Sequence, residues 1–359
     1  MTYDLFQPLA DGPLSTRNRI AMAPMTRSRA LGNLPNALMA DYYGQRRGAG
    51  LIISEGTSPS PEGLGYPRIP GLFSDAQAAA WKPVVAAAKA DGARFVVQLM
   101  HTGRIANARN LPAGAEVIAP SAVRAAGQIW TDSDGQQDHD VPRAMEAADI
   151  ARVTADYVRA ARLALDAGFD GVEIHAANGY LPNQFLNPKS NLRTDGYGGS
   201  ADHRQRFLLE VVDAVAAAIG RERVGVRLSP FNSYNDLAAG YPGEAEETLA
   251  LVRKLQDRRI GYLHLITTPL PVELVDAVRA AFRGTLVLAG DYDADKANAA
   301  IAAGRADLVA FARHFIGNPD LPERLRRKLP LAAFDGSKLF SAGSDGYNDY
   351  PAYAAPVAA

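Results

Sequence analysis

The stretch GFDGVEIHAANGY, residues 168–180, decides the fold, because a helix end, a buried strand and a polar turn follow one another within it. Residues 146–167 upstream carry a long amphipathic pattern that ends at Gly168, and glycine is well suited to close a helix in the left-handed conformation. Residues 171–174 form a short, mainly apolar run, which is typical of a strand buried on both faces of a parallel sheet. A helix followed by such a strand is the building unit of an α/β fold.

The same alternation recurs along the chain. We expect eight strands, at residues 20–24, 51–54, 95–99, 171–174, 224–228, 262–265, 286–289 and 308–311. We expect helices at residues 36–47, 75–90, 146–167, 204–219, 244–258, 272–282, 293–303 and 319–327. Eight strands that alternate with helices predict a (β/α)₈ TIM barrel, with a doubly wound open sheet as the alternative.

Three segments extend this barrel within a single predicted domain of residues 1–359. Residues 1–19 precede the first strand, and their leucines predict a hairpin that plugs the barrel floor. Residues 101–144 form a long polar excursion after the third strand. Loops of that length inside a compact domain are usually functional, so we expect an active-site lid there. Residues 331–359 form a C-terminal extension with little periodicity.

Composition restricts the partners and the chemistry. The formal net charge is −1 at pH 7, which argues against nucleic acid or an anionic membrane as the main partner. No apolar run reaches the roughly 20 residues of a membrane helix, and the first residues show no signal-peptide pattern, so we expect a cytoplasmic protein. The sequence has no cysteine, which excludes disulfides, thiol nucleophiles and cysteine-ligated iron–sulfur clusters.

The residues at the carboxyl ends of the strands are the candidates for function, because TIM barrels carry their chemistry there. Gly290-Asp291 follows the seventh predicted strand and Ala312-Arg313 follows the eighth. These two turns form the usual phosphate-binding corner of the fold. A glycine there permits close backbone approach, and backbone amides together with a cation can hold a dianion.

A second polar group follows the fourth strand. His175 and Asn178 can donate two hydrogen bonds to one oxygen, and Tyr180 is a neutral phenol at physiological pH. Two donors on a carbonyl oxygen beside a proton donor are what polarisation of an enone or an acyl group requires. Each of these residues alone is also typical of packing at the barrel rim. Gln98 and Arg227, at two other strand ends, are equally consistent with a buried polar pair.

Two other kinds of chemistry find little support. Asp138-His139-Asp140 resembles a metal-binding cluster, but its place in the polar excursion favours a solvated loop, so we predict no metal site. A Schiff-base aldolase needs a lysine at a strand end, and none stands at the carboxyl end of any predicted strand.

Several longer motifs run through the chain. They are APMTR at 23–27, GYP at 65–67, QL-x-H-x-GR at 98–104, GFDGVEIH at 168–175, N-xxx-N-x-R-x-D-x-YGG at 187–199, DLVAF at 307–311 and NPDL at 318–321. With these motifs in this order, the chain resembles the Old Yellow Enzyme family of FMN-dependent ene reductases almost from end to end.

The resemblance implies roles for the residues at the barrel mouth. The flavin ring of FMN would contact Pro24, Met25, Thr26, Gly56, Gln98 and Arg227, and its phosphate would contact Gly290, Asp291, Ala312 and Arg313. Tyr180 would donate a proton, and His175 with Asn178 would bind the substrate oxygen. Tyr66, Met100 and Phe231 would line the substrate pocket. Thr26 stands where another branch of the family has a redox-tuning cysteine.

The chain departs from the family at the phosphate corner. Gly290-Asp291 replaces the usual Gly-Gly, Ala312-Arg313 replaces the usual Gly-Arg, and His314 replaces proline. The repulsion between a carboxylate and a phosphate charge at 4 Å reaches about 4 kcal/mol at an effective dielectric of 20. We therefore expect that FMN is retained but bound more weakly than in relatives. Met100 also differs from the aromatic residue of many relatives, and a flexible thioether makes the pocket wall more adaptable.

The resemblance thus implies a reductase of small electrophilic alkenes, that is enals, enones, nitroalkenes or maleimides, with NADPH or NADH as electron donor. The alternative is a flavin-binding or cofactor-depleted barrel with a non-catalytic or sensing role, which the charge of Asp291 motivates. The lack of cysteine excludes the larger flavin barrels that carry an iron–sulfur cluster.

Overall fold

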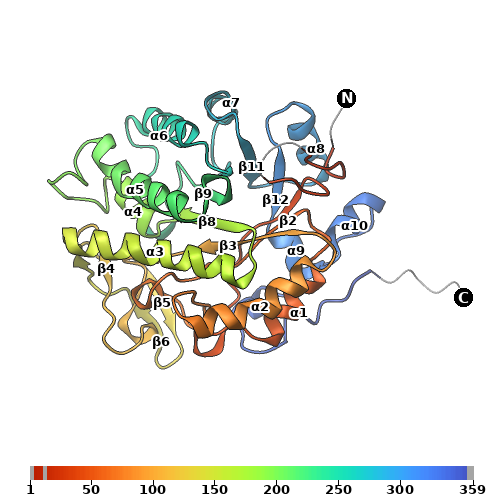
Figure 1. Ribbon diagram of the computed structural model, residues 1–359, viewed down its shortest axis with the longest axis horizontal. Helices are drawn as coiled ribbons and strands as arrows, with labels where there is room; N and C mark the ends of the chain where they lie inside the picture. The colour runs from red at the N-terminus through yellow and green to blue at the C-terminus, as the bar shows by residue number, and fades with distance from the viewer. Residues whose placement is uncertain (1–3, 11–13, 354–359) are drawn as a thin grey trace, which may run out of the picture.

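Eight parallel strands close into a barrel in the computed structural model, which describes residues 4–10 and 14–353 (Figure 1). The strands are β1 (Ile20–Met22), β2 (Leu51–Ile53), β3 (Arg94–Leu99), β8 (Gly171–Ala176), β9 (Val224–Leu228), β10 (Tyr262–Ile266), β11 (Thr285–Ala289) and β12 (Leu308–Phe311). Because β1 pairs with both β2 and β12, the sheet has no open edge. This closure confirms the predicted TIM barrel and excludes the open sheet.

Helices surround the barrel (Figure 1). They are α1 (Ala37–Gln45), α2 (Asp75–Lys89), α3 (Ala147–Ala167), α5 (Ala201–Ile219), α6 (Glu244–Arg258), α7 (Val272–Ala281), α8 (Ala294–Ala302) and α10 (Leu321–Arg327). Helix α5 begins three residues before its predicted start, because Ser200 caps a polar first turn by accepting from the His203 amide. Two further helices, α4 (Leu181–Leu186) and α9 (Arg313–Gly317), were not predicted, since they are too short to show a 3.6-residue pattern.

The N-terminal segment closes the floor of the barrel. Leu9 and Thr16 form an antiparallel bridge through two backbone hydrogen bonds of 2.9 Å. Leu9 and Leu14 pack against apolar side chains from the barrel strands, among them Val96 and Leu308. The bridge between Leu9 and Thr16 agrees with the predicted hairpin, and residues 1–3 and 11–13 lie outside the described residues.

The excursion after β3 contains short strands that we had predicted as loop. It comprises a parallel pair, β4 (Ile118–Ala119) with β7 (Arg143–Ala144), and a hairpin, β5 (Gln128–Thr131) with β6 (Gly135–Asp138). Its apolar residues Ile105, Ala125 and Ile129 pack against Tyr66 and Tyr180. The excursion thus lies over residues of the barrel mouth.

The side chain of His139 is buried within this excursion, with 5% of its surface exposed, whereas Asp138 is exposed. The expectation of a solvated loop is therefore wrong for the histidine. Among the described residues, no group of three or more His, Asp and Glu side chains is arranged to hold a metal ion.

The C-terminal extension is fastened to the barrel by two buried arginines. Arg29 donates to the carbonyl oxygens of Leu339, at 2.6 Å, and Asp345, at 2.9 Å. Arg27 donates to the carbonyl of Gly346 at 2.5 Å, and the next residue, Tyr347, stacks on Tyr42 with ring centroids 4.1 Å apart. Carbonyl ligation of this kind leaves no periodic pattern in the sequence.

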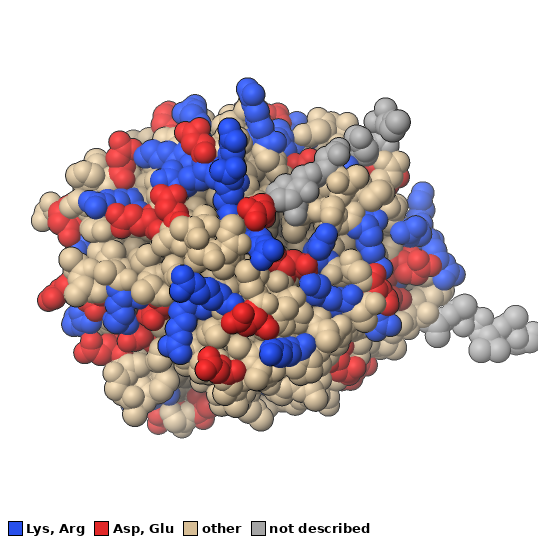
Figure 2. Space-filling model, viewed as in Figure 1, with Lys and Arg blue, Asp and Glu red and all other residues tan. Residues whose placement is uncertain are grey.

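The surface carries charges of both signs. Figure 2 shows Lys and Arg interspersed with Asp and Glu over the face that it presents, in keeping with the formal net charge of −1. Of the helices in the described ranges, none has the length and apolar character needed to cross a bilayer.

Candidate functional site

The turn after β8 brings the three catalytic candidates together. Strand β8 extends two residues beyond its predicted end, so that His175 lies within it and pairs in register with Arg227 of β9. The chain then turns through Asn178 and Gly179, whose φ values are 55° and 79°, and Tyr180 caps the short helix α4. Left-handed φ values suit asparagine and glycine, which explains how the chain reverses so sharply here.

The His175 imidazole is neutral and has a defined tautomer. Its ring is 2% exposed, and the backbone N–H of Ala177 donates to its Nδ1 at 3.3 Å. Burial, with the charge of Arg227 and nearby His264, holds the pKa of His175 well below its usual value. Because Nδ1 accepts a hydrogen bond, the proton of the neutral ring is on Nε2, which is then available as a donor.

The backbone of Asn178 is fixed by its neighbours. Its N–H donates to Ser229 Oγ at 2.8 Å, and its carbonyl accepts from Asn235 Nδ2 at 2.6 Å. The N–H of Gly179 donates to Asn183 Oδ1 at 3.0 Å. The Asn178 side-chain Oδ1 is buried and has no partner in the described part of the chain. The amide is therefore held in place by its main chain and remains free to bind a ligand.

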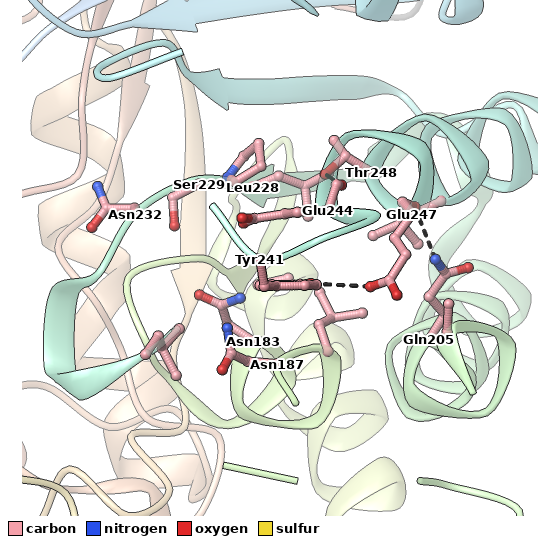
Figure 3. A pocket seen from close by; sticks show the side chains of 16 residues that line it. Asn183, Asn187, Gln205, Leu228, Ser229, Asn232, Tyr241, Glu244, Glu247 and Thr248 are labelled. Carbon is pink, nitrogen blue, oxygen red and sulfur yellow. Dashed lines mark hydrogen bonds between the residues drawn. The ribbon is translucent and has the colours of Figure 1, made fainter. Parts of the chain in front are cut away.

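A small cavity lies behind this turn. Figure 3 shows its lining residues, among them Ser229, Asn183, Tyr241, Glu244 and Glu247. Its volume of about 50 Å³ leaves room for one or two water molecules and is far too small for an organic cofactor. Two of its lining residues, Ser229 and Asn183, are the ones that hold the turn in place by hydrogen bonds.

Tyr180 forms a pair with Tyr66. The two phenol oxygens lie 3.1 Å apart and share a hydrogen bond, and the His175 ring meets the Tyr180 ring edge-on with centroids 4.9 Å apart. Burial raises the pKa of Tyr180, although Tyr66, Asn235 and Arg227 oppose that rise. Burial and the neighbouring Tyr180 raise the pKa of Tyr66 well above its usual value. Tyr180 therefore stays protonated at neutral pH.

Of the three pocket residues predicted from the sequence, two lie beside Tyr180. Met100 and Tyr66 pack in one cluster with it. Phe231 instead packs against the main core, with φ 59° and its N–H bound to Glu244 Oε1 at 2.7 Å. Asn232 and Tyr234 of the same loop line the mouth cavity, and neither was among the residues expected from the sequence.

The interior below the mouth contains a buried polar network. Gln98 Nε2 donates to Glu173 Oε1 at 2.7 Å, and His264 Nδ1 lies 2.9 Å from Glu173 Oε2. Arg227 is 8% exposed, and its Nε has no hydrogen-bond partner among the described residues. The sequence reasoning left open a pair between Gln98 and Arg227, but the structure pairs Gln98 with Glu173. The sequence reasoning missed Glu173 and His264 as site residues. The signal that could have found Glu173 is a charged residue within a buried strand.

The ends of β1 and β2 form the opposite wall. Pro24, Met25 and Thr26 are half-buried there. Gly56 is buried, and a Cβ at that position would lie 2.4 Å from Met100 Sδ, so only glycine allows Met100 to approach this closely. Beside it, burial raises the pKa of Glu55 to about 7, against the hydrogen bond from the Arg27 N–H.

A cavity of about 540 Å³ opens at the carboxyl ends of the barrel strands, within the usual size range of small-molecule sites. Its lining includes Ala23, Asn178, Arg227, Gly290, Asp291, Ala312, Arg313 and His314. Gly290 has φ 149°, and a Cβ there would lie 2.7 Å from Thr267 Oγ1. Asp291 is exposed, and Lys296 Nζ donates to the backbone carbonyl oxygen of Asp291 at 3.2 Å. Lys296 is a further cation at this corner that the sequence reasoning missed.

Comparison with known proteins gives consistent matches. The model of the NADH:flavin oxidoreductase / NADH oxidase family matches residues 4–332. The 12-oxophytodienoate reductase 1 of Oryza sativa subsp. japonica is 39% identical over 97% of this chain and 92% of its own length. The structure of morphinone reductase superimposes with a TM-score of 0.94 at 44% identity, over 98% of this chain and 97% of that one. The structure of an old yellow enzyme homologue from Zymomonas mobilis gives 0.93 at 42% identity, over 98% and 100%.

Proposed function

The chain belongs to the NADH:flavin oxidoreductase / NADH oxidase family, with old yellow enzyme homologues among its relatives, and on that premise we propose that it reduces activated carbon–carbon double bonds. The family makes it an FMN-dependent oxidoreductase. The proposal adds the class of substrate and the residues that act on it.

The residues at the mouth fit FMN. The cavity is of suitable size, and Arg227 brings to it a buried guanidinium whose Nε has no partner in the described part of the chain. Such a donor costs free energy unless a ligand satisfies it, and the electron-rich end of a flavin ring would do so. At the other end, Gly290 leaves its backbone accessible, and Arg313 and Lys296 supply positive charge for a phosphate.

We assign the FMN contacts by position. Pro24, Met25, Thr26, Gly56, Gln98 and Arg227 would hold the ring, and Gly290, Asp291, Ala312 and Arg313 would hold the phosphate through backbone amides and the arginine. When bound and reduced by NAD(P)H, FMN would supply the hydride that the alkene receives. Side chains of the protein would bind the substrate oxygen and donate the proton.

His175 and Asn178 would bind the oxygen that activates the alkene. His175 offers a neutral Nε2–H, and the Asn178 side chain is carried by a backbone that Ser229 and Asn235 hold in place. As negative charge develops on the substrate oxygen, two fixed donors stabilise it without reorganisation, and the low exposure of the site strengthens both hydrogen bonds. The Asn178 and His175 pair thus selects substrates with a carbonyl or nitro oxygen.

Tyr180 would give a proton to the carbon that lies alpha to the activating group. It stays protonated because burial raises its pKa, and Tyr66 is placed to stabilise the phenolate by a hydrogen bond once the proton has left. The excursion that covers both tyrosines with Ile105, Ala125 and Ile129 limits the access of water. Met100 and Tyr66 would form the apolar wall of the substrate pocket.

NADH or NADPH is proposed as the electron donor. Among the relatives, a structure of morphinone reductase in complex with tetrahydroNAD superimposes with a TM-score of 0.93. A nicotinamide would enter through the same open mouth as the alkene, because the floor of the barrel is closed by Leu9 and Leu14. The two compounds would therefore use the site in turn.

The observation that carries the proposal is the placement of Tyr180, 3.1 Å from Tyr66 and edge-on to His175, two residues after Asn178, which lines the mouth cavity together with Arg227. The test is Tyr180→Phe, assayed separately for reduction by NADPH and for reoxidation by an enone. We expect reoxidation to slow by about 10²- to 10⁴-fold and reduction to stay nearly unchanged.

Tyr241→Phe is the matched control, since its hydroxyl binds Glu247 beside the small cavity of Figure 3 and away from the mouth. It should leave both half-reactions unchanged. Equal slowing of both half-reactions in Tyr180→Phe would show that the proton-donor assignment is wrong.

One observation favours a second candidate, a flavin-binding or cofactor-depleted barrel with a sensing role. Asp291 puts a carboxylate at the phosphate corner, where it opposes FMN binding. The visible spectrum separates the two functions. A yellow protein that is bleached anaerobically by NAD(P)H and recoloured by an enone is an ene reductase, whereas a colourless protein, or one that the enone does not recolour, supports the second candidate.

A further inference from the structure

A buried carboxylate lies in the barrel interior and has no part in the function proposed above. Glu173 on β8 is fully buried, and both of its oxygens are engaged. Oε1 accepts from Gln98 Nε2 at 2.7 Å, and Oε2 lies 2.9 Å from His264 Nδ1. These partners come from the strands β3 and β10, so the carboxylate joins three strands of the barrel.

Glu173 is ionised in this setting. Burial alone would raise its pKa, but His264, Arg227 and the amide of Gln98 together hold the pKa below its usual value. Burial lowers the pKa of His264, so its ring is neutral and its Nδ1–H donates to the carboxylate. The negative charge is also felt by Tyr262, whose pKa burial and Glu173 raise well above the usual value.

The Glu173 carboxylate determines the orientation of the Gln98 side-chain amide. A glutamine amide has one donor side and one acceptor side, and the Glu173 carboxylate can only accept. Gln98 therefore turns its Nε2 toward Glu173, and its Oε1 is left to accept a hydrogen bond from elsewhere. The positive charge of Arg227 interacts with the carboxylate of Glu173, and it would also interact with a flavin ring bound at the barrel mouth.

We propose that Glu173, held by His264, is a positioning residue that fixes the Gln98 amide and sets the reduction potential of the bound flavin. The inference rests on the proposed function, in which Gln98 and Arg227 hold the flavin ring. A buried anion near the ring opposes the gain of negative charge on reduction and offsets part of the effect of Arg227, because charges interact strongly where water is excluded. Glu173 would thus keep the potential lower than Arg227 alone would make it.

The central test is Glu173→Gln, which removes the charge and keeps the shape. We expect a more positive potential, with the equilibrium constant for two-electron reduction changed at least tenfold, equivalent to about 30 mV. The absorption maximum of the flavin should move as well, because the amide at position 173 no longer dictates the orientation of Gln98. Both are measured on the purified holoprotein, the potential by equilibration with a reference dye.

Two further variants separate charge from structure. Glu244→Gln is the matched control, because Glu244 is also a buried carboxylate with both oxygens bound, to the N–H groups of Phe231 and Gly240. It should leave the potential unchanged whatever it does to stability. His264→Phe replaces the donor to Oε2 with an apolar aromatic ring that cannot donate a hydrogen bond, so burial then drives Glu173 toward its neutral form. The His264→Phe variant should shift the potential in the same direction, and it tests the inference if Glu173→Gln does not fold.

The outcomes are distinct. A Glu173→Gln or His264→Phe protein that binds FMN with the wild-type potential and spectrum overturns this inference and leaves the proposed function intact. An equal shift in Glu244→Gln overturns it too, since loss of any buried carboxylate would then suffice. A wild-type protein that fails to bind FMN overturns the proposed function and this inference with it.

Discussion

The two ends of the mouth cavity differ in how their residues are held. At the β8–β9 end, His175 and Arg227 are buried within strands, and neighbouring groups fix the turn that carries Asn178. At the β11–β12 end, Asp291 and Arg313 are exposed. Rigid, dehydrated groups make strong and directional interactions, whereas exposed charges are screened by water and salt. We infer that changes at the first end act mainly on chemistry and changes at the second mainly on FMN affinity.

Among the variants that compare the two ends, the largest effect is expected for His175→Ala, because it removes a fixed donor to the substrate oxygen. Reoxidation of the reduced protein by an enone should slow by about 10²- to 10³-fold in stopped-flow experiments. His203→Ala, which changes an exposed histidine at the start of α5, is the control. Since the pKa of His175 lies well below its usual value, the imidazole is neutral from pH 6 to 8 and should cause no rate change there. A wild-type rate in His175→Ala would show that His175 does not hold the substrate.

The next prediction concerns Glu55, on the wall formed by β1 and β2. Its pKa is about 7 in the folded protein and about 4.5 when unfolded, so the neutral form is favoured by folding. The resulting stability is complete below pH 4.5 and is lost as the pH rises to 7, by an amount on the order of 3 kcal/mol. Glu55→Gln should remove this loss.

Denaturant unfolding at several pH values between 5 and 8 measures the effect. The difference in unfolding free energy between Glu55→Gln and the wild type should move in favour of the variant as the pH rises, and level off above pH 7. Glutamine can still accept from the Arg27 N–H, so the wall should keep its shape. A difference that does not vary with pH would show that Glu55 is ionised throughout the range.

Gly290→Ala tests the phosphate end. The backbone there has φ 149°, and the new methyl group would lie 2.7 Å from Thr267 Oγ1 and 2.8 Å from Thr268 Oγ1. Strain of about 1–3 kcal/mol should weaken FMN binding by roughly 5- to 150-fold, measured by fluorescence titration. Gly304→Ala is the matched control, because Gly304 also has a positive φ, 67°, but open space around it. It should lower stability and leave FMN affinity unchanged.

The sequence predicted the barrel well, because strands buried on both faces are short apolar runs and do not depend on alternation. It also placed His175, Asn178 and Tyr180 on one turn, since a polar group directly after a buried strand is visible without a structure. Their roles remain proposals. The sequence did not show Glu173 and His264 as a pair, because 91 residues separate them and the contact exists only once the barrel has closed.

Other features escaped the sequence for local reasons. Phe231 was expected in the pocket, but it packs against the main core, with a left-handed backbone and its N–H bound to Glu244. Asn232 and Tyr234 of the same loop line the mouth cavity. Lys296 was overlooked because it lies in the first turn of α8 and not directly at a strand end. Contacts of this kind depend on how a loop is folded and not on residue type alone.

The smallest effect is expected for Asp291→Asn at the phosphate end. Its carboxylate is exposed and lies at the corner where the FMN phosphate is proposed to bind. Screened charge pairs at such sites contribute about 0.2–1 kcal/mol, so FMN affinity should rise by roughly 1.4- to 5-fold. The gain should shrink as salt is raised from 50 mM to 500 mM, because the repulsion is screened. Asp295→Asn, an exposed aspartate outside the cavity lining, should change the affinity less. If Asp291→Asn weakened FMN binding, the carboxylate would have to face away from the phosphate and act through the loop.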